Sequence, residues 1–147
     1  MKFTLRSATQ GDHGKIRQLI RRVKINPMGL DWRRFTVAVT PTGELVGCGQ
    51  VKIHNDGSRE LASIAVVEDF RNQGIATTII DFLINVTPKP IYLTCRSSLE
   101  TFYQRFNFET IQENEMPPYF KRINRLSKVF LKLTRRPERL LVMRQQP

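Results

Sequence analysis

Residues 61–84, LASIAVVEDFRNQGIATTIIDFLI, decide the fold of this chain. They begin with a short apolar run, residues 64–67, whose length and β-branched content are typical of a buried strand. From Ile75 onward, apolar residues recur at three- and four-residue intervals, which predicts a helix over 75–86. The stretch therefore predicts a strand, a tight turn containing Gly74, and a helix.

The predicted turn has the features of an anion site. A helix start leaves backbone N–H groups unpaired and carries the positive end of the helix dipole. Gly74 and Ala76 are small enough for a bulky anion to reach the backbone, and Arg71 adds a positive charge. These residues alone leave two interpretations open, a phosphate-binding loop and an ordinary strand-to-helix connection.

Length and composition indicate one ordinary globular domain. The chain has 147 residues, of which 40% are hydrophobic, enough for a core without disulfides or metals. Cys48 and Cys95 lie far apart in strand-like segments, which favours small buried hydrophobes over a disulfide scaffold or reactive thiols. The two histidines, His13 and His54, are also distant, so no metal-ligand spacing exists and no metal is expected.

The distribution of charge and hydropathy along the chain indicates where the protein is located and which partners it binds. The chain turns polar soon after Met1, and no apolar run approaches membrane-spanning length, so we expect a cytoplasmic location and no membrane partner. The net charge of +11 favours polyanionic partners such as nucleic acid or a ligand with several phosphates. Residues 121–147 carry nine basic residues against one acid, Glu138, although a solvated surface explains most of such an excess.

The rest of the chain supplies further strands and helices. Strands are expected over 3–6, 35–39, 45–53, 60–67, 91–95, 108–111 and 129–133, and helices near 12–23, 75–86 and 99–106. This order predicts an α/β chain of the α+β type, with a mixed, mostly antiparallel central sheet of about seven strands flanked by helices. We expect one domain over residues 1–134 and a partly ordered basic C-terminal tail over 135–147.

Two motifs within this order resemble those of one family. Arg71, Gly74 and Ala76 match the pattern of Gln or Arg, two residues, Gly, one residue, Gly or Ala, placed after a buried strand. Residues 102–108, FYQRFNF, match an aromatic-Tyr pair on a late helix followed by Gly-Phe. The chain thus resembles the GCN5-related N-acetyltransferases, the GNAT family of acetyl-CoA-dependent acyltransferases, which implies the acyl-CoA N-acyltransferase fold.

The chain departs from the family pattern at two positions. Asn107 stands where the second motif usually has glycine, a mild change because asparagine tolerates the left-handed backbone. Arg96 stands where an asparagine is common seven positions before Tyr103, which weakens the case for a polar cofactor contact there.

The resemblance implies a site for acetyl-CoA, as a cosubstrate. The backbone of the strand at Ile64, Ala65 and Val66 would pair with the pantetheine arm like an added strand. The pyrophosphate would lie at the helix start, held by Arg71, Asn72, Gln73, Gly74, Ile75, Ala76 and Thr77.

The resemblance also implies direct attack of a primary amine on the thioester. Tyr103 takes the family's position for the acid that protonates the leaving thiolate, and its alternative role is an aromatic residue of a helix core. Glu60 is the best-placed base, with an exposed hairpin glutamate as the alternative. His54 is a weaker candidate beside the 55–57 turn, where a solvated histidine is the competing interpretation, and Arg105 is either a phosphate contact or a solvated helix arginine.

The acceptor stays open at this stage. Residues 116–122 and 125–129 are similar to the end of amino-acid N-acetyltransferases that act on glutamate, and a basic site suits an acidic amino acid or an acidic protein segment. Small amines, protein lysines and N-termini stay open as well. The alternative function is a catalytically inactive, basic GNAT-like module that binds a partner protein or nucleic acid, with nucleic acid not favoured. The chain is expected to be a monomer or a homodimer.

Overall fold

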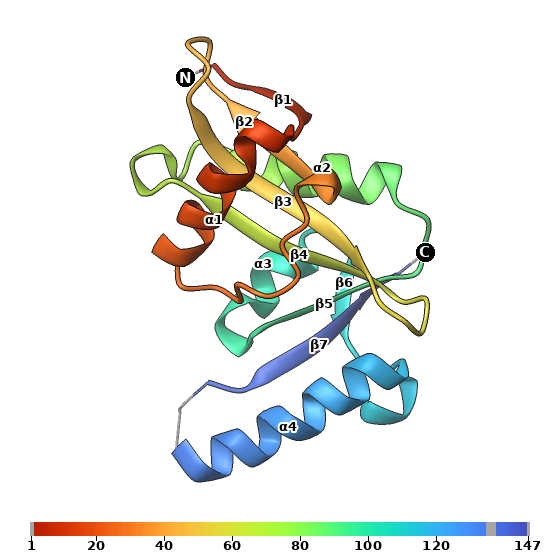
Figure 1. Ribbon diagram of the computed structural model, residues 1–147. Helices are drawn as coiled ribbons and strands as arrows, with labels where there is room; N and C mark the ends of the chain where they lie inside the picture. Colours follow the sequence, from red (N-terminus) through yellow and green to blue (C-terminus); the bar gives the residue numbers. More distant parts are fainter. Residues whose placement is uncertain (1, 135–137, 147) are drawn as a thin grey trace. The chain divides into compact units, whose positions relative to one another are not determined.

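The computed structural model describes residues 2–134 and 138–146 and confirms the predicted mixed sheet (Figure 1). Seven strands follow the order β1-β2-β3-β4-β5-β7-β6. The strands are β1 (Thr4–Ser7), β2 (Phe35–Val39), β3 (Leu45–Ile53), β4 (Arg59–Val66), β5 (Ile91–Arg96), β6 (Phe108–Thr110) and β7 (Leu140–Gln145). The α-helices are α1 (His13–Arg22), α2 (Ile75–Val86), α3 (Glu100–Gln104) and α4 (Pro118–Thr134). The contacts divide the chain into two compact units.

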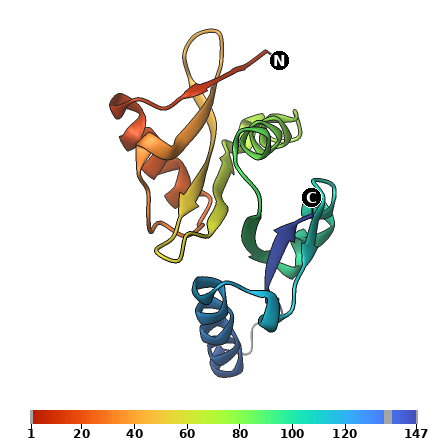
Figure 2. The same cartoon turned by 90° about the vertical axis from the view of Figure 1, so that its right-hand side faces the viewer.

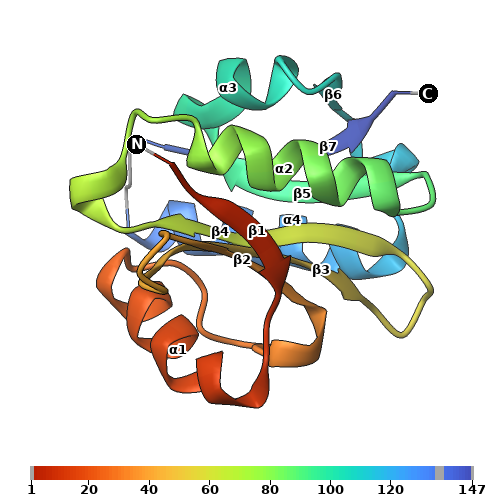
Figure 3. The same ribbon diagram turned by 90° about the horizontal axis from the view of Figure 1, so that it is seen from above.

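The first unit comprises residues 1–52 and 61–87. In it, β1 pairs antiparallel with β2, and β2 with β3. Helices α1 and α2 cover opposite faces of these strands (Figures 2 and 3). Gly47 and Gly49 on β3 make the close approach of α2 possible, because a Cβ on either would lie 2.7 Å from an isoleucine side chain of that helix. On the other face, Ile16 and Ile20 of α1 pack in a buried cluster with Cys48.

The second unit comprises residues 53–60 and 88–147. There β7 lies between β5 and β6 and is antiparallel to both, and β5 pairs in parallel with β4 at Arg59↔Ile91 and Glu60↔Tyr92. Helix α4 runs beside β7 (Figure 1). Its Phe120 is fully buried in a cluster with Tyr92 and Val142.

The structure corrects the sequence-based interpretation of the C-terminal region in two places. Residues 129–133 belong to helix α4 and do not form the expected strand. Their alternation coexists with a helical spacing of apolar residues that begins at Leu126, and the helix prevails. Residues expected in a partly ordered tail instead form β7, whose Leu141, Val142 and Met143 are buried. Residues 135–137 and 147 of that tail lie outside the described residues.

The expectation that both cysteines are buried is confirmed. Cys48 and Cys95 are free and buried, and burial raises the pKa of their thiols to about 12 and about 11. Thr9 and Asp12 cap the turn that precedes α1 and bond to each other reciprocally. Within the described ranges, no helix is long and apolar enough to cross a bilayer.

Candidate active site

The connection from β4 to α2 forms an exposed turn with two left-handed residues. Strand β4 ends at Val66, and a short 3-10 turn over Glu68–Phe70 leads to Arg71. Asn72 and Gly74 follow with φ of 64° and 82°, the region that asparagine and glycine tolerate best. Space inside the protein does not require a glycine at position 74, since an added Cβ would meet no atom within 4 Å.

The start of α2 presents backbone N–H groups without a capping side chain. Gly74 is the N-cap residue and makes no side-chain cap hydrogen bond. The Thr78 amide donates to the Gly74 carbonyl at 3.0 Å, and the Thr78 hydroxyl donates to the same oxygen at 2.7 Å. The amides before Thr78 lie in the first helical turn, which has no intrahelical acceptors. Ile75, which is 1% exposed, anchors the turn to the core, so these amides are held in place.

Arg71, the positively charged residue of the predicted site, lies beside this turn. The side chain of Arg71 is exposed, and its Nε donates to the Val66 carbonyl at 3.4 Å. Asn72, Gln73 and Gly74 are exposed too. An uncapped helix start, an accessible arginine and an open approach are features that phosphate-binding helix starts share.

Strand β4 contains a distortion that no sequence pattern indicates. Ser63 has φ of 60°, a left-handed conformation in the middle of a strand. Two side chains of β3 hold it: Gln50 Nε2 donates to the Ser63 hydroxyl at 2.8 Å, and Cys48 Sγ donates to its carbonyl at 3.6 Å. Gln50 is fully buried, and its Oε1 accepts no hydrogen bond from the described residues. Such strain commonly marks functional positions, and here it lies next to the strand residues Ile64, Ala65 and Val66.

Glu60, in the second unit, is a buried carboxylate with a defined partner. It is 6% exposed, which overturns the alternative of an exposed hairpin glutamate. Its Oε1 is 2.7 Å from His54 Nε2, and its Oε2 accepts from the Thr94 hydroxyl at 3.5 Å. His54 is therefore not a solvated turn histidine, since only 13% of its side chain is exposed. The hairpin brings the two predicted proton-handling residues together.

His54 is also fixed from its flat face. The Tyr119 ring stacks on the imidazole at a centroid distance of 3.5 Å and an angle of 14°. Asp56 secures this arrangement because its Oδ2 accepts the Tyr119 amide at 2.9 Å, which caps the start of α4 from the hairpin turn. Burial opposes ionisation of Asp56, but hydrogen bonds from Ser58 and Tyr119 outweigh it and lower its pKa.

A cleft opens beside this cluster. It has a volume of about 570 Å³ and is lined by Ile53, His54, Asn55, Asp56, Pro118, Tyr119 and Arg122. The sequence placed His54 near a turn and Tyr119 in the segment 116–122, but it indicated no contact between these two residues, which are 65 positions apart. The role of Tyr119 becomes visible only when α4 meets the hairpin.

Tyr103 lies on α3 with its ring among aromatic residues. The rings of Phe102 and Phe108 approach it edge-on, with centroids at 5.0 and 6.3 Å. Burial, with a smaller contribution from the charge of Cys95, raises the pKa of Tyr103 to about 12. The hydroxyl is therefore a neutral hydrogen-bond donor at physiological pH.

The second motif has the backbone that its sequence predicts. Asn107 has φ of 71°, so it adopts the left-handed conformation expected of the glycine it replaces. Arg105 lies over the rings of Phe102 and Phe106 at 5.4 and 5.9 Å from their centroids, an arrangement that holds its guanidinium against the helix surface.

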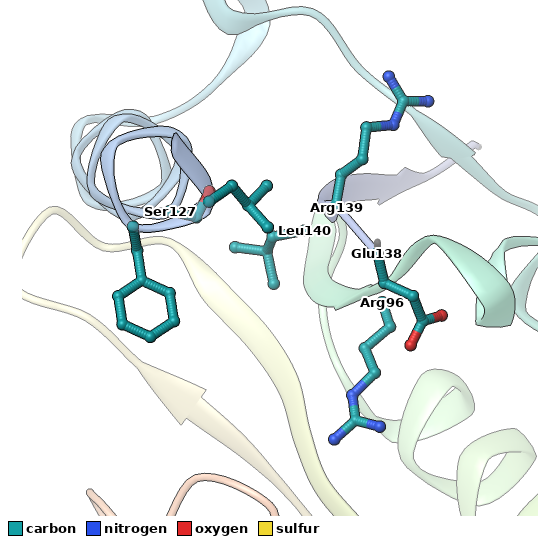
Figure 4. Close-up of a pocket in the computed structure, with 7 residues that line it drawn as sticks. Arg96, Ser127, Glu138, Arg139 and Leu140 are labelled. Carbon is teal, nitrogen blue, oxygen red and sulfur yellow. The ribbon is translucent and has the colours of Figure 1, made fainter. Parts of the chain in front are cut away.

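Arg96 lines a separate cavity of the second unit (Figure 4). The cavity has a volume of about 360 Å³, and its walls are Arg96, Ser127, Phe130, Leu131, Glu138, Arg139 and Leu140. The side chains of Arg96 and Glu138 extend in the same direction, and Arg139 extends away from them (Figure 4). A Glu138 carboxylate oxygen accepts the Ser98 amide at 3.2 Å, which fixes its position. The cavity thus combines both charges with apolar walls.

The predicted site residues fall into two groups. The first unit holds the cofactor-binding candidates from Ile64 to Thr77, and the second holds Glu60 and Tyr103. His13 is half-buried at the start of α1 and lines a cleft with Trp32, away from both groups in the sequence. Within residues 2–134 and 138–146, no cluster of three His, Cys, Asp or Glu side chains is suited to hold a metal ion.

Solved structures of other proteins share the fold of this chain. The chain matches Rv2747 from Mycobacterium tuberculosis, solved in complex with CoA, with 21% identity and a TM-score of 0.71 over 95% of this chain and 97% of that one. It matches N-acetylglutamate synthase from Neisseria gonorrhoeae, complexed with coenzyme A and N-acetyl-glutamate, at 21% identity and a TM-score of 0.69. That match covers all of this chain but 36% of the Neisseria chain. The ribosomal-protein-S18-alanine N-acetyltransferase of Escherichia coli gives 16% identity and a TM-score of 0.69 over 98% and 93% of the two chains. The fold is that of the acyl-CoA N-acyltransferases.

A family comparison gives the assignment. The sequence profile of the acetyltransferase (GNAT) domain matches residues 31–110, more than half of the chain. The chain belongs to the GNAT acetyltransferase family. No match was found among curated proteins.

Proposed function

We propose that the protein is an N-acetyltransferase that transfers the acetyl group of acetyl-CoA directly to a primary amine. The observation that carries the proposal is the uncapped start of α2 behind the left-handed Gly74, with Arg71 exposed beside it. Backbone amides fixed at a helix start bind the pyrophosphate of a coenzyme without reorganisation. The CoA present in the Rv2747 and Neisseria structures supports this ligand.

The residues before this turn would hold the rest of the cosubstrate. Ile64 and Val66 are half-buried residues of β4, and their backbone would supply hydrogen-bonding groups for the amides of a pantetheine arm. Ala65 is 4% exposed and faces the core, so its side chain fixes the strand while its neighbours present their backbone. The left-handed Ser63 sets the direction in which β4 continues to these residues.

Glu60 and His54 would remove the proton from the acceptor ammonium. Glu60 accepts the proton directly or through a water, and His54, at 2.7 Å from it, fixes the carboxylate and offers a second proton acceptor. The amine nitrogen then forms a bond to the thioester carbonyl carbon as the carbon–sulfur bond breaks. No acyl-enzyme step is needed, in keeping with the high thiol pKa of both cysteines.

Tyr103 would stabilise the leaving thiolate. Its pKa of about 12 keeps the phenol protonated, so it can donate a hydrogen bond or a proton to the sulfur. An ordinary thiol has a pKa of about 8.5, so complete transfer from the phenol is uphill. The hydrogen bond to the developing charge is then the larger part of its contribution.

The acceptor we propose to test first is an acidic amino acid. The resemblance of residues 116–122 and 125–129 to glutamate acetyltransferases supports this class, as does the N-acetyl-glutamate in the Neisseria structure. The cleft beside His54 offers Arg122 for a carboxylate of such an acceptor. Other small amines, protein lysines and protein N-termini are the remaining acceptor classes.

Two measurements test the proposal in sequence. Acetyl-CoA should raise the thermal midpoint of the folded protein, because it binds the native state alone. A screen of acetyl-CoA consumption over acidic and neutral amino acids, arylalkylamines, polyamines and peptides should then identify the acceptor. An unchanged midpoint at millimolar acetyl-CoA, in a sample with a cooperative unfolding transition, would contradict the cosubstrate assignment.

A second candidate is a basic binding module without turnover. Helix α4 motivates it, since it contains five lysines and arginines and no acidic residue. Binding to RNA or DNA that falls steeply with salt, is unaffected by coenzyme A and occurs without turnover would favour this function over acetyl transfer.

A further inference from the structure

Helix α4 exposes a row of large apolar side chains along its C-terminal half. Leu126, Val129 and Leu133, here called the α4 stripe, are 61%, 57% and 79% exposed. Their spacing of three and four residues places them in one line along the helix surface. They are three of the nine large hydrophobic residues that are exposed in the described part of the chain, and α2 carries a smaller pair, Phe82 and Val86.

The α4 stripe is not the face by which the helix is anchored. Phe120 and Asn124 are 0% and 7% exposed, and Phe120 packs α4 against Tyr92 and Val142 of the strands. Leu131, on the same side, is half-buried beside Leu140. At 100° per residue, the stripe is centred more than a quarter turn from this buried face. The helix therefore has two apolar faces, and the second meets solvent, which is unusual for a protein surface.

The surroundings of the α4 stripe are strongly basic. The helix carries Lys121, Arg122, Arg125, Lys128 and Lys132 without one acidic residue. Arg125 and Lys128 both contact the same carboxylate, Glu113, so one negative charge serves two cations. These two cations and Lys132 lie on the side of the helix next to Val129.

An apolar row with basic neighbours favours some binding partners of α4 over others. A second copy of the chain would bring its own basic helix against this one, and like charges at an apolar contact oppose pairing. An apolar line bordered by lysine and arginine is the pattern of helices that lie in the interface of an anionic bilayer. There the apolar side chains enter the acyl boundary while the cations meet lipid phosphates. The net charge of +11 attracts the whole chain to the same surface.

We propose that α4 docks the protein on anionic lipid membranes, with the α4 stripe inserted into the headgroup region. This goes beyond acetyl transfer and does not depend on it. It also revises the expectation of no membrane partner, which considered only runs long enough to span a bilayer.

Flotation with vesicles tests the proposal. The intact protein should bind vesicles of equal parts phosphatidylglycerol and phosphatidylcholine in 0.1 M salt and should not bind vesicles of phosphatidylcholine alone. The double variant Leu126→Ser/Leu133→Ser should reduce the partition coefficient roughly tenfold or more, because two leucine side chains leave the membrane. Lys128→Gln/Lys132→Gln should reduce it about fivefold for each cation removed.

Matched variants elsewhere separate docking from general charge attraction. Phe82→Ser/Val86→Ser removes two exposed apolar side chains of α2, and Arg17→Gln/Arg21→Gln removes two exposed cations of α1. Both controls should bind like the unaltered protein or lose less than twofold. Circular dichroism and thermal unfolding of each variant establish that the fold is retained.

Three outcomes would overturn the proposal. Equal losses in the α1 and α4 charge variants, with no loss in Leu126→Ser/Leu133→Ser, would reduce the binding to non-specific charge attraction. A concentration-dependent dimer that Leu126→Ser/Leu133→Ser abolishes, without vesicle binding, would assign the stripe to a second copy. Stripe-dependent binding to soluble polyglutamate, without vesicle binding, would make the occupant an acidic protein.

Discussion

The β4–α2 turn of the first unit and the Glu60–His54 cluster of the second unit are built in opposite ways. The turn is exposed, and it offers backbone amides whose positions depend on the left-handed Gly74. The cluster is buried, and it offers side chains whose positions depend on hydrogen bonds and ring stacking. A site made of backbone amides should keep its function after many side-chain substitutions, provided that the backbone conformation is kept. A site made of side chains should lose its function when the carboxylate or its hydrogen-bond partner is removed.

Replacing the buried carboxylate should have the largest effect. Glu60→Gln keeps the size of the side chain but removes the proton acceptor, so kcat should fall by about 10² to 10³. The KM for acetyl-CoA should change little if the turn alone holds the coenzyme. Steady-state kinetics with the identified acceptor measures both. Glu109→Gln, an exposed change on β6, is the matched control and should leave kcat within twofold. Unchanged kcat in Glu60→Gln would remove this residue from proton transfer.

Removing the phenol hydroxyl should have an intermediate effect. Tyr103→Phe keeps the aromatic packing with Phe102 and Phe108, so the thermal midpoint should stay close to that of the unaltered protein. We expect kcat to fall by about 10- to 100-fold because the leaving thiolate loses its donor. Since the pKa of Tyr103 is raised to about 12, the phenol stays protonated as pH rises, and its ionisation should cause no loss of activity below about pH 11. A Tyr103-dependent loss near pH 9 would contradict this environment.

Gly74 of the turn can be compared with Gly43, a glycine of similar backbone conformation that lies outside the proposed site. Gly74 and Gly43 have φ of 82° and 87°, and an added Cβ at either would meet no atom within 4 Å. Substitution by alanine should therefore cost each about 1–2 kcal/mol of unfolding free energy through backbone strain. Gly74→Ala alone should raise the Kd for acetyl-CoA, by about tenfold, because the amides shift from the pyrophosphate. Calorimetric titration and chemical denaturation measure the two effects. Equal affinity in both variants would contradict the assignment of the turn.

The two sites also differ in how far the sequence predicted them. Strands β2 and β3 and helix α2 have the bounds expected from the sequence, because their apolar residues are buried between clear turn signals. The turn was predictable for the same reason, since it lies between two regular elements and contains a glycine that the helix start needs. The pairing of Glu60 with His54 was harder to predict because it depends on how the hairpin folds. The stacking of Tyr119 on His54 depends on helix α4, and residues 129–133 of that helix were expected to form a strand.

What the sequence could not provide are the contacts between distant segments. The left-handed conformation of Ser63 depends on Gln50 and Cys48 of β3, and no local pattern around a serine in a strand specifies it. Strand β7 was missed because its apolar residues 140–143 lie between arginines, and the run looked too short to separate from a tail. Its place between β5 and β6 is a property of the assembled sheet.

A second buried carboxylate, Asp12, gives the smallest effect and the sharpest contrast with Glu60. Asp12 is 5% exposed and accepts from Arg6 at 2.7 and 3.1 Å. The hydrogen bond from Arg6, opposed by burial and aided by the Thr9 amide, lowers its pKa to about 2. A pKa lowered in the folded state contributes stability above the unfolded value of about 3.9, and this contribution is lost as the pH falls through about 2.

Asp12→Asn should therefore lower the unfolding free energy at pH 7, because the folded state loses the ion pair with Arg6. The loss should be only about 1–2 kcal/mol, since Arg6 is partly exposed and solvent screens the pair. The difference from the unaltered protein should shrink as the pH falls from 4 to 2, which urea denaturation at a series of pH values measures. The kcat of Asp12→Asn should stay within twofold of the unaltered value at 25 °C. If Asp12→Asn instead lost activity as Glu60→Gln does, burial of a carboxylate would not distinguish a structural ion pair from a catalytic base in this fold.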